Sequence, residues 1–229
     1  IVNTCCFIGD AKEESINTIL EMAQLKEEGK CRILLVAGCL AQRYRKEILK
    51  EIPEVDGILG TASYDRIREV LAQADKRQKE LSISQEKPVC MEVLNRLPES
   101  GTERILTTGG HYAFLKIAEG CDKHCTYCII PYTRGRVRSR KAESVKEEVI
   151  ALAKAGFQEI VLTGIHLSSY GIDRKGEETD SLLKLIVELH AVPGIERIRL
   201  GSLEPNIITE GFVRTISRLP KVCPHFHLS

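Results

Sequence analysis

The chain has 229 residues, of which 33 are Lys or Arg and 32 are Asp or Glu, so its formal net charge is +1. A chain of this length forms one large or two modest domains, and its 43% apolar content is enough for a sizeable core. The near-neutral charge does not single out a nucleic-acid partner, and no apolar run approaches the length of a membrane span. We therefore expect no membrane association.

The two ends of the sequence are unusual. The chain opens with IVNTCC, without an initiator Met or a secretory signal, and closes with CPHFHLS inside a predicted strand. We expect a fragment of a longer protein, with elements missing at both ends. Nine cysteines without a signal peptide favour metal ligands or catalytic thiols in a reducing cytoplasm over a disulfide framework.

Residues 1–80 are predicted to form an α/β domain, truncated at its start. Apolar runs and helical periodicity predict strands at 1–7, 31–40 and 55–61, and helices at 11–29, 41–53 and 63–81, with Ser63 as the N-cap of the last. This alternation predicts a doubly wound parallel sheet, whose ligands bind beyond the carboxyl ends of the strands. Cys5 and Cys39 lie at two such ends, so we expect these thiols to meet on one rim.

Residues 81–111 lose this periodicity and are predicted to be a linker with some strand content. Residues 112–229 return to alternation, with strands at 112–120, 158–164, 195–202 and 224–229 and helices at 144–156, 181–192 and 208–219. Ser144 and Glu147 are expected to form a capping box. This repeat predicts part of a βα barrel, truncated at its end, whose active site lies at the carboxyl ends of the strands.

The stretch GCDKHCTYCIIPYTRGRVRSRK follows the first of these barrel strands and carries Cys121, Cys125 and Cys128. Structural zinc is closed by four ligands, and His124 is the only other candidate inside the loop. A 4Fe–4S cluster held by three cysteines instead leaves one iron open to a substrate or cofactor. The spacing C-x3-C-x2-C, with Tyr127 directly before the last cysteine, favours the cluster over zinc.

With this motif, the chain resembles the radical S-adenosylmethionine (radical SAM) superfamily, and specifically its methylthiotransferases. The resemblance covers nearly the whole chain: NTC and AGCLAQR resemble the amino-terminal methylthiotransferase domain, in which three cysteines hold a second 4Fe–4S cluster. It implies that Cys5 and Cys39 are two of these ligands and that the third lies upstream of NTC. Cys6 is interpreted as a small buried residue, because adjacent cysteines rarely reach one cluster well.

The resemblance also implies a mechanism. The cluster at Cys121, Cys125 and Cys128 would chelate S-adenosylmethionine and cleave it reductively, and the resulting radical would abstract hydrogen from an unreactive C–H. The second cluster would supply sulfur for a methylthio group. An electron donor such as flavodoxin or ferredoxin is the implied partner.

Further candidate residues fall in LTGIHLSSYG and RLGSLEP, at the ends of the second and third barrel strands, and in the cysteine loop itself. The expected cofactor-binding residues are Tyr127, Thr163, Gly164, His166, Ser202 and Glu204. For the strand-end residues the alternative is a loop cap, a turn former or a buried core histidine. His225 and His227 are predicted to lie on the strand that follows.

A run of arginines follows the cysteine loop. RGRVRSR predicts an extended strip with one charged side, which suits contacts to phosphates. The expected RNA-contact residues are Arg134, Arg136, Arg138 and Arg140. The alternative is that part of the run braces the cysteine loop.

The two halves indicate different substrates. The sequence up to LKIAEGCDKHCTYCIIP resembles the enzyme that modifies an aspartate in a small-subunit ribosomal protein. The sequence from PYTRGRVRSR onward resembles the enzyme that modifies threonylcarbamoyladenosine beside the tRNA anticodon, and a chimera joined at the shared motif is one interpretation. Because the barrel mouth contacts the target, tRNA is the preferred substrate, the ribosomal protein is the alternative, and a zinc-stabilised RNA-binding module is the rival class.

Overall fold

The computed structural model describes residues 1–80, 86–95, 97, 105–106, 109–174 and 181–229. The helices and strands, in chain order, are β1 (Val2–Thr4), α1 (Gly9–Glu27), β2 (Leu35–Gly38), α2 (Cys39–Glu51), β3 (Gly57–Leu59), η1 (Tyr64–Arg66), α3 (Ile67–Lys79), β4 (Val89–Cys90), β5 (Tyr112–Glu119), α4 (Ile130–Arg134), β6 (Arg138–Ser139), α5 (Ala142–Lys154), β7 (Glu159–Gly164), η2 (Leu167–Ser169), α6 (Leu182–His190), β8 (Arg197–Leu200), η3 (Pro205–Ile207) and α7 (Glu210–Ile216). Within these ranges, none of the helices has the length and apolar character needed to cross a membrane. The chain divides into two units, residues 1–98 with 123–135 and residues 99–122 with 136–229.

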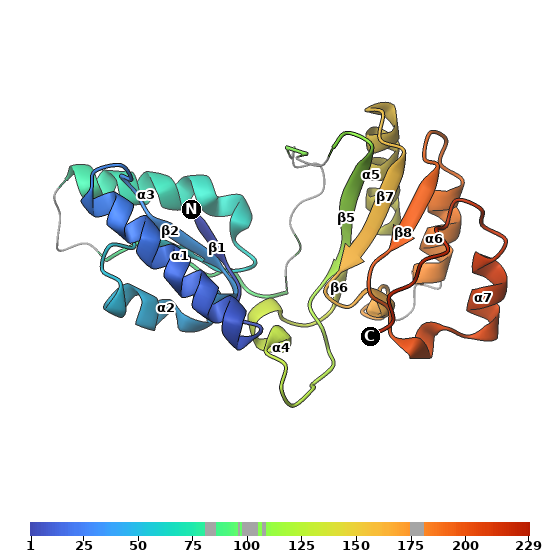
Figure 1. Ribbon diagram of the computed structural model, residues 1–229, viewed down its shortest axis with the longest axis horizontal. Helices are drawn as coiled ribbons and strands as arrows, with labels where there is room; N and C mark the ends of the chain where they lie inside the picture. The colour runs from blue at the N-terminus through green and yellow to red at the C-terminus, as the bar shows by residue number, and fades with distance from the viewer. Residues whose placement is uncertain (81–85, 96, 98–104, 107–108, 175–180) are drawn as a thin grey trace. The chain divides into compact units, whose positions relative to one another are not determined.

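The first unit is built on a four-stranded parallel sheet in the order β1-β2-β3-β4 (Figure 1). Successive strand residues point to opposite faces, so both faces must be covered by apolar side chains. Val36 belongs to a hydrophobic cluster that includes Ile19 of α1, whereas its neighbour Leu35 belongs to a second cluster with Val70 of α3. Helices therefore cover both faces, which confirms the predicted doubly wound sheet.

The last strand of this sheet, β4, lies inside the segment predicted to be a linker. It pairs in parallel with β3, joining Ile58 to Val89 and Leu59 to Cys90. A two-residue strand is too short to leave a periodic signal in the sequence, which is why alternation alone could not assign it.

Both capping predictions are wrong. Ser63 precedes the short η1 rather than α3, and its buried hydroxyl accepts a hydrogen bond from the backbone N of Glu92 at 2.9 Å. Helix α5 begins at Ala142, so Ser144 lies inside it and its hydroxyl accepts from Arg140 at 3.1 Å. At Ser63 a tertiary hydrogen bond replaced the local cap that the sequence suggested, whereas Ser144 bonds to Arg140, four residues earlier in the chain.

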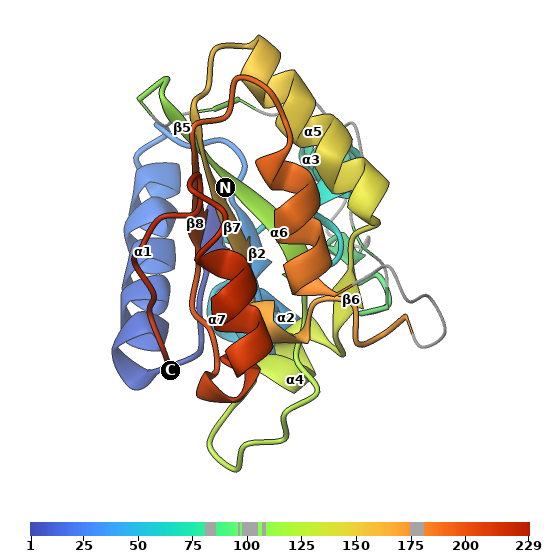
Figure 2. The same cartoon turned by 90° about the vertical axis from the view of Figure 1, so that its right-hand side faces the viewer.

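The second unit contains a sheet in the order β6-β5-β7-β8, in which β5, β7 and β8 are parallel and the short β6 is antiparallel. Helices α5, α6 and α7 lie against one face of this sheet (Figure 2). Isolated parallel bridges join Ile198 to Val222 and Leu203 to Leu228, but residues 224–229, with His225 and His227, do not form the strand that was predicted there. The sheet and its helices form the expected partial βα barrel.

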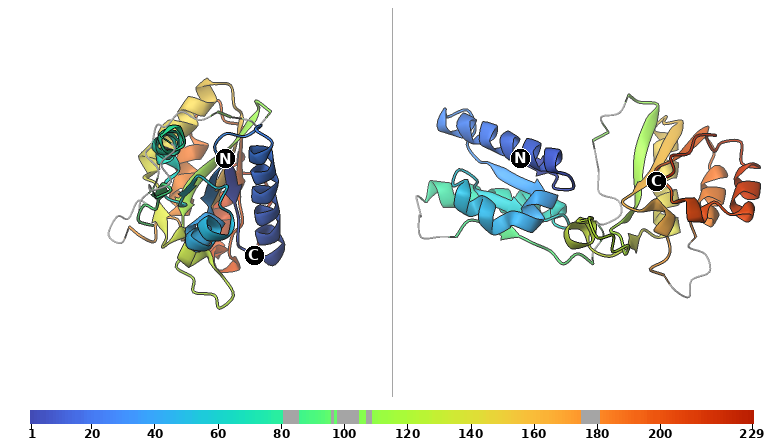
Figure 3. Two further views of the ribbon diagram at one scale, coloured as in Figure 1. Left: turned by 90° about the vertical axis from the view of Figure 1, so that its left-hand side faces the viewer. Right: turned by 60° about the horizontal axis from the view of Figure 1, so that its bottom comes forward.

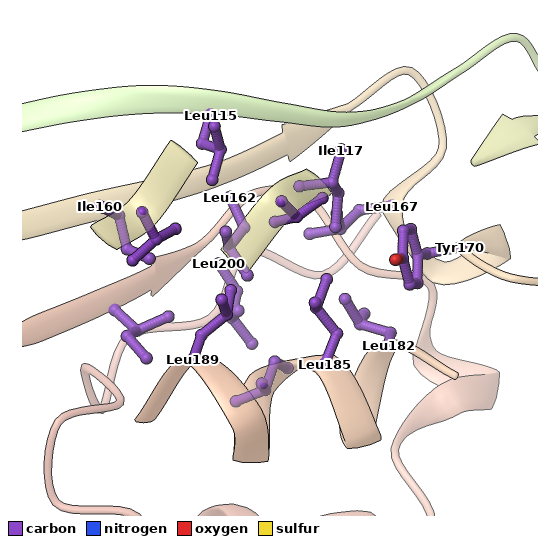
Figure 4. Close-up of a cluster of buried hydrophobic side chains, with 14 of the residues drawn as sticks. Leu115, Ile117, Ile160, Leu162, Leu167, Tyr170, Leu182, Leu185, Leu189 and Leu200 are labelled. Carbon is purple, nitrogen blue, oxygen red and sulfur yellow. The ribbon is translucent and has the colours of Figure 1, made fainter. Parts of the chain in front are cut away.

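The core of the second unit consists of branched aliphatic side chains from strands and helices (Figure 4). Leu115 of β5, Leu162 of β7 and Leu185 of α6 are each at most 1% exposed. Strand β8 reads RIRL, with Ile198 and Leu200 buried and Arg197 exposed, because the helices of this core cover one face of the sheet.

One buried acidic residue ties two barrel strands together at their amino ends. Glu159 of β7 accepts hydrogen bonds from Nε of Arg197 at 2.7 Å and Nε of Arg199 at 3.0 Å, both on β8. The hydrogen bond from Arg197 is the main cause that lowers the pKa of Glu159, and Arg199 acts in the same direction. The ionised carboxylate therefore stabilises the β7–β8 pair.

Replacing Glu159 with Gln should lower the free energy of unfolding at pH 7 by about 1 kcal/mol, allowing for the partial exposure of both guanidinium groups. The pKa of Glu159 is depressed in the folded state, so its contribution is complete above the unfolded value of about 4.3 and is lost as the pH falls through the folded pKa. Urea unfolding of both proteins from pH 7 to pH 3 should show the difference shrinking. The control is Glu210→Gln, which removes an exposed ion pair with Arg214 on one helix. A difference in unfolding free energy between Glu159→Gln and the parent that does not change with pH would contradict this explanation.

Candidate functional site

Cys5 and Cys39 lie at the same edge of the first sheet. Strands β1 and β2 are parallel neighbours whose last residues, Thr4 and Gly38, are paired in register. Cys5 follows Thr4 directly, and Cys39 is the first residue of α2 after Gly38. The carboxyl ends of adjacent parallel strands thus bring together two thiols that are far apart in sequence, as predicted.

Two residues beside these cysteines shape the edge. The hydroxyl of Thr4 donates to the carbonyl oxygen of Ala37 at 2.6 Å and accepts from the backbone N of Ala41 at 3.4 Å, joining the end of β2 to the first turn of α2. Gly38 has a φ of 98°, and a Cβ there would lie 2.4 Å from the carbonyl oxygen of Thr4. Only glycine lets the two chain segments approach this closely.

The backbone of Cys5 is held by α1. The hydroxyl of Ser15, a residue only 8% exposed, accepts from the backbone N of Cys5 at 3.0 Å and lies 2.7 Å from the carbonyl oxygen of Ala11. Sequence reasoning missed Thr4, Gly38 and Ser15. The Thr inside NTC and the Gly before Cys39 were the available signals, whereas a serine inside a helical pattern gives none.

Cys6 differs from its two neighbours. It is half-buried and packs against the hydrophobic cluster of α1 and α2. Burial, with smaller contributions from Cys39 and Cys5, raises its pKa to about 11. A metal ligand must be a thiolate, so these surroundings fit the interpretation of Cys6 as a small buried residue.

The loop of Cys121, Cys125 and Cys128 joins β5 to α4 and has no helix or strand of its own. Cys121 is buried, Cys125 is exposed and Cys128 is partly buried, and none of the three is in a disulfide. The backbone N of Cys128 donates to the carbonyl oxygen of Cys125 at 3.0 Å. Across the described ranges, no group of three or more His, Cys, Asp or Glu side chains is arranged to hold a metal ion. The ligand assignments therefore stay predictions.

The donor set nevertheless fits the expected group. Three cysteines outside any disulfide, on irregular backbone, match in number and type the three thiolates that a 4Fe–4S cluster with one open iron requires. Cys5 and Cys39 supply two of three thiols for a second cluster from a shared sheet edge.

The ends of β7 and β8 bring several predicted cofactor residues together. Nε2 of His166 lies 2.8 Å from Oε1 of Glu204, and its Nδ1 lies 2.5 Å from the hydroxyl of Ser169. The hydroxyl of Ser168 accepts from the backbone N of Glu204 at 2.8 Å. The backbone of Glu204 is thus held by the loop after β7, and its carboxylate lies beside His166 at the carboxyl edge of the sheet, where the barrel prediction placed the site.

The other predicted cofactor residues are less closely linked. Thr163 and Gly164 end β7 beside β5, and the hydroxyl of Ser202 lies 2.7 Å from Nδ1 of His227. Tyr127 is 83% exposed. Their roles in binding remain predictions.

The arginine run is largely engaged within the protein. Arg138 is 9% exposed and donates to the carbonyl oxygen of Arg136 at 2.7 Å, while Arg140 pairs with Glu148 at 2.6 Å. Arg134 donates from Nε to Sγ of Cys39 at 3.1 Å, and only Arg136 is exposed. These contacts engage three of the four arginines within the protein, and both RNA contact and bracing of the cysteine loop stay predictions.

Two segments match known protein families. Residues 1–60 match the uncharacterized protein family UPF0004, and residues 115–175 match the radical SAM superfamily. The first match covers the strand ends with Cys5 and Cys39, and the second covers the three-cysteine loop and the end of β7. The two matches define a radical SAM domain behind a second thiol-bearing domain.

Curated relatives extend over the whole chain. It is 46% identical over 228 residues to the ribosomal protein uS12 methylthiotransferase RimO of Lachnoclostridium phytofermentans, covering 100% of this chain and 50% of that protein. It is 45% identical over 233 residues to RimO of Acetivibrio thermocellus, covering 100% of this chain and 49% of that one. The chain spans about half the length of the curated relatives it matches. These matches confirm the predicted resemblance: over its whole extent the chain is similar to radical SAM methylthiotransferases.

The same relatives bear on the substrate. Both are named for a ribosomal protein, so they favour the alternative substrate over the preferred tRNA. Among solved structures, the radical S-adenosylmethionine methyltransferase TsrM from Kitasatospora setae, with tryptophan and a SAM analogue bound, is 16% identical and covers 91% of this chain and 51% of that one, with a TM-score of 0.44.

Replacing Gly38 with Ala should disturb the edge that carries both cysteines. The left-handed conformation alone costs about 1–3 kcal/mol, and the added methyl group clashes with the carbonyl oxygen of Thr4. Urea unfolding should show this loss. Gly9→Ala is the matched control, because a Cβ there meets nothing within 4 Å; equal stability of the two variants would refute this account of Gly38.

Proposed function

We propose that this chain forms the cluster-bearing part of a radical SAM methylthiotransferase that acts on ribosomal protein uS12. The main support is the similarity, over the whole of this chain, to curated enzymes named for this activity. The three-cysteine loop and the paired strand ends at Cys5 and Cys39 supply thiols where two clusters would be needed.

The residues divide into two groups by role. Cys121, Cys125 and Cys128 would hold one 4Fe–4S cluster, and Cys5 and Cys39 would contribute to the other. Such clusters supply one-electron chemistry with S-adenosylmethionine and the sulfur for transfer when they are bound. The chain's own task is to fix the thiols, orient the cofactor and exclude water.

Glu204 is the best-positioned group for orienting the cofactor. His166 lies beside its carboxylate, and the hydroxyl of Ser168, from the same loop, accepts from its backbone N. The carboxylate keeps partial exposure, with 27% of the side chain accessible, so it can accept from an amino or ribose group of S-adenosylmethionine. The same contacts hold the ends of β7 and β8 together.

Replacing Cys125 with Ala should abolish reductive cleavage of S-adenosylmethionine and lower iron and acid-labile sulfide after anaerobic reconstitution, because one of three thiolate ligands is removed. The measurement is iron, zinc and sulfide per chain together with formation of 5′-deoxyadenosine. Cys31→Ala, which removes a thiol outside both proposed sites, should retain both properties. Zinc without sulfide in the parent protein, with unfolding of the Cys125 variant, would support the zinc-stabilised RNA-binding module instead.

The substrate is tested by direct competition. The full-length protein, loaded anaerobically, should add a methylthio group to uS12 in the small ribosomal subunit and leave tRNA unmodified, as mass spectrometry of both would show. The second-half resemblance to the tRNA enzyme makes modified threonylcarbamoyladenosine the opposing result, and it would overturn the proposed substrate. Cleavage of S-adenosylmethionine without modification of either would support a chimera. The Cys125→Ala variant is the negative control and should modify neither substrate.

A further inference from the structure

Helix α4 is anchored to the first unit immediately after the cysteine loop. The carbonyl oxygen of Thr133, a residue 1% exposed, accepts from the hydroxyl of Thr61 at 2.5 Å. Helix α4 lies beside α2 (Figure 3). It ends at Arg134, where Gly135 leaves the helix with a φ of 74° and donates its N–H to the carbonyl oxygen of Pro131 at 3.1 Å. The backbone on both sides of Arg134 is therefore fixed.

From this fixed position the Arg134 side chain reaches the edge of the first sheet. Its Nε donates to Sγ of Cys39 at 3.1 Å, across 95 residues of sequence. Cys39 is the first residue of α2, so the guanidinium group lies at the sheet edge that also carries Cys5. Both residues belong to the same unit.

We propose that Arg134 is a positioning residue for the cluster that Cys39 holds, an inference that rests on the proposed function because that function makes Cys39 a ligand. The Nε–H group fixes the direction of the Cys39 sulfur. The same hydrogen bond and the guanidinium charge stabilise the more negative, reduced cluster and so raise its reduction potential.

The chemistry of the side chain makes this role specific. Ligating sulfur carries negative charge, and N–H donors to such sulfurs are among the features that set the potential of iron–sulfur clusters. Arginine stays charged at all relevant pH values and donates in a fixed planar geometry, whereas lysine supplies charge without that geometry. Lysine should therefore restore part of the effect of charge and little of the effect of orientation.

The contact also changes the interpretation of the arginine run. Arg134 was predicted to contact RNA, yet its Nε–H is directed to a thiol inside the protein. A role as a simple brace between α4 and α2 is the competing explanation. A brace would affect stability and leave the potential of the cluster unchanged.

The test uses the full-length protein with Cys121, Cys125 and Cys128 replaced by Ala, so that the cluster at Cys39 is measured alone. Arg134→Gln, Arg134→Lys and Arg68→Gln are compared by redox titration followed by electron paramagnetic resonance, with iron and sulfide content and circular dichroism. Arg68 is an exposed arginine of α3 in the same unit, so its replacement makes the same charge change away from Cys39.

The expected result is a shift to more negative potential in Arg134→Gln, a smaller shift in Arg134→Lys and none in Arg68→Gln. Loss of iron from Arg134→Gln with retained helix signal also supports the proposal. Equal potentials and equal iron content in Arg134→Gln and Arg68→Gln overturn it. If Cys39→Ala leaves iron and sulfide unchanged in this background, the assignment of Cys39 itself fails, which separates failure of the proposed function from failure of the role of Arg134.

Discussion

The parallel pairing of β1 with β2 is the constraint on which the first unit depends. Its register places Thr4 opposite Gly38, and the chain leaves each strand at a cysteine. Any slip by one residue would turn Thr4 away from Ala37 and separate the two thiols. Val36 and Leu35 oppose such a slip. Their side chains pack into different hydrophobic clusters on opposite faces of the sheet, and a slip would disrupt both.

The second unit uses the same principle with a different result. Parallel β5, β7 and β8 end on one edge, where β5 leads into the cysteine loop and the loops after β7 and β8 meet at His166 and Glu204. The amino edge carries the Glu159 ion pairs instead. The ion pairs thus lie at one edge of the barrel strands and the predicted site residues at the other, which is the arrangement expected for βα barrels.

Sequence patterns predicted the features that depend on local periodicity and on strand ends. The alternation of strands and helices, the shared edge of Cys5 and Cys39, and the family resemblance followed from residues close together in the chain. The two-residue β4 and the role of Ser63 did not, because their hydrogen bonds join distant segments. Ser144 was misassigned because α5 begins two residues earlier, at Ala142.

The arginine run shows the same limit. Four arginines at alternate positions predict a charged strip, but the structure directs Arg138 and Arg140 into contacts within the second unit. Ser139 of β6 is fixed by Asp173, 34 residues away in sequence. The Asp173 carboxylate accepts from the backbone N of Ser139 at 3.0 Å and from its hydroxyl at 2.6 Å. The charge pattern of the run cannot predict Asp173 as a partner, because the tertiary fold brings the two segments together.

The central claim is that thiols from both units ligate iron–sulfur clusters, and an iron-edge anomalous difference map of anaerobically reconstituted crystals tests it most directly. The account predicts two compact iron peaks, one bonded to Cys39 and Cys5 and the other to Cys121, Cys125 and Cys128 with one iron lacking a protein ligand. A single zinc ion closed by four protein ligands, or iron bound away from these sulfurs, would contradict it.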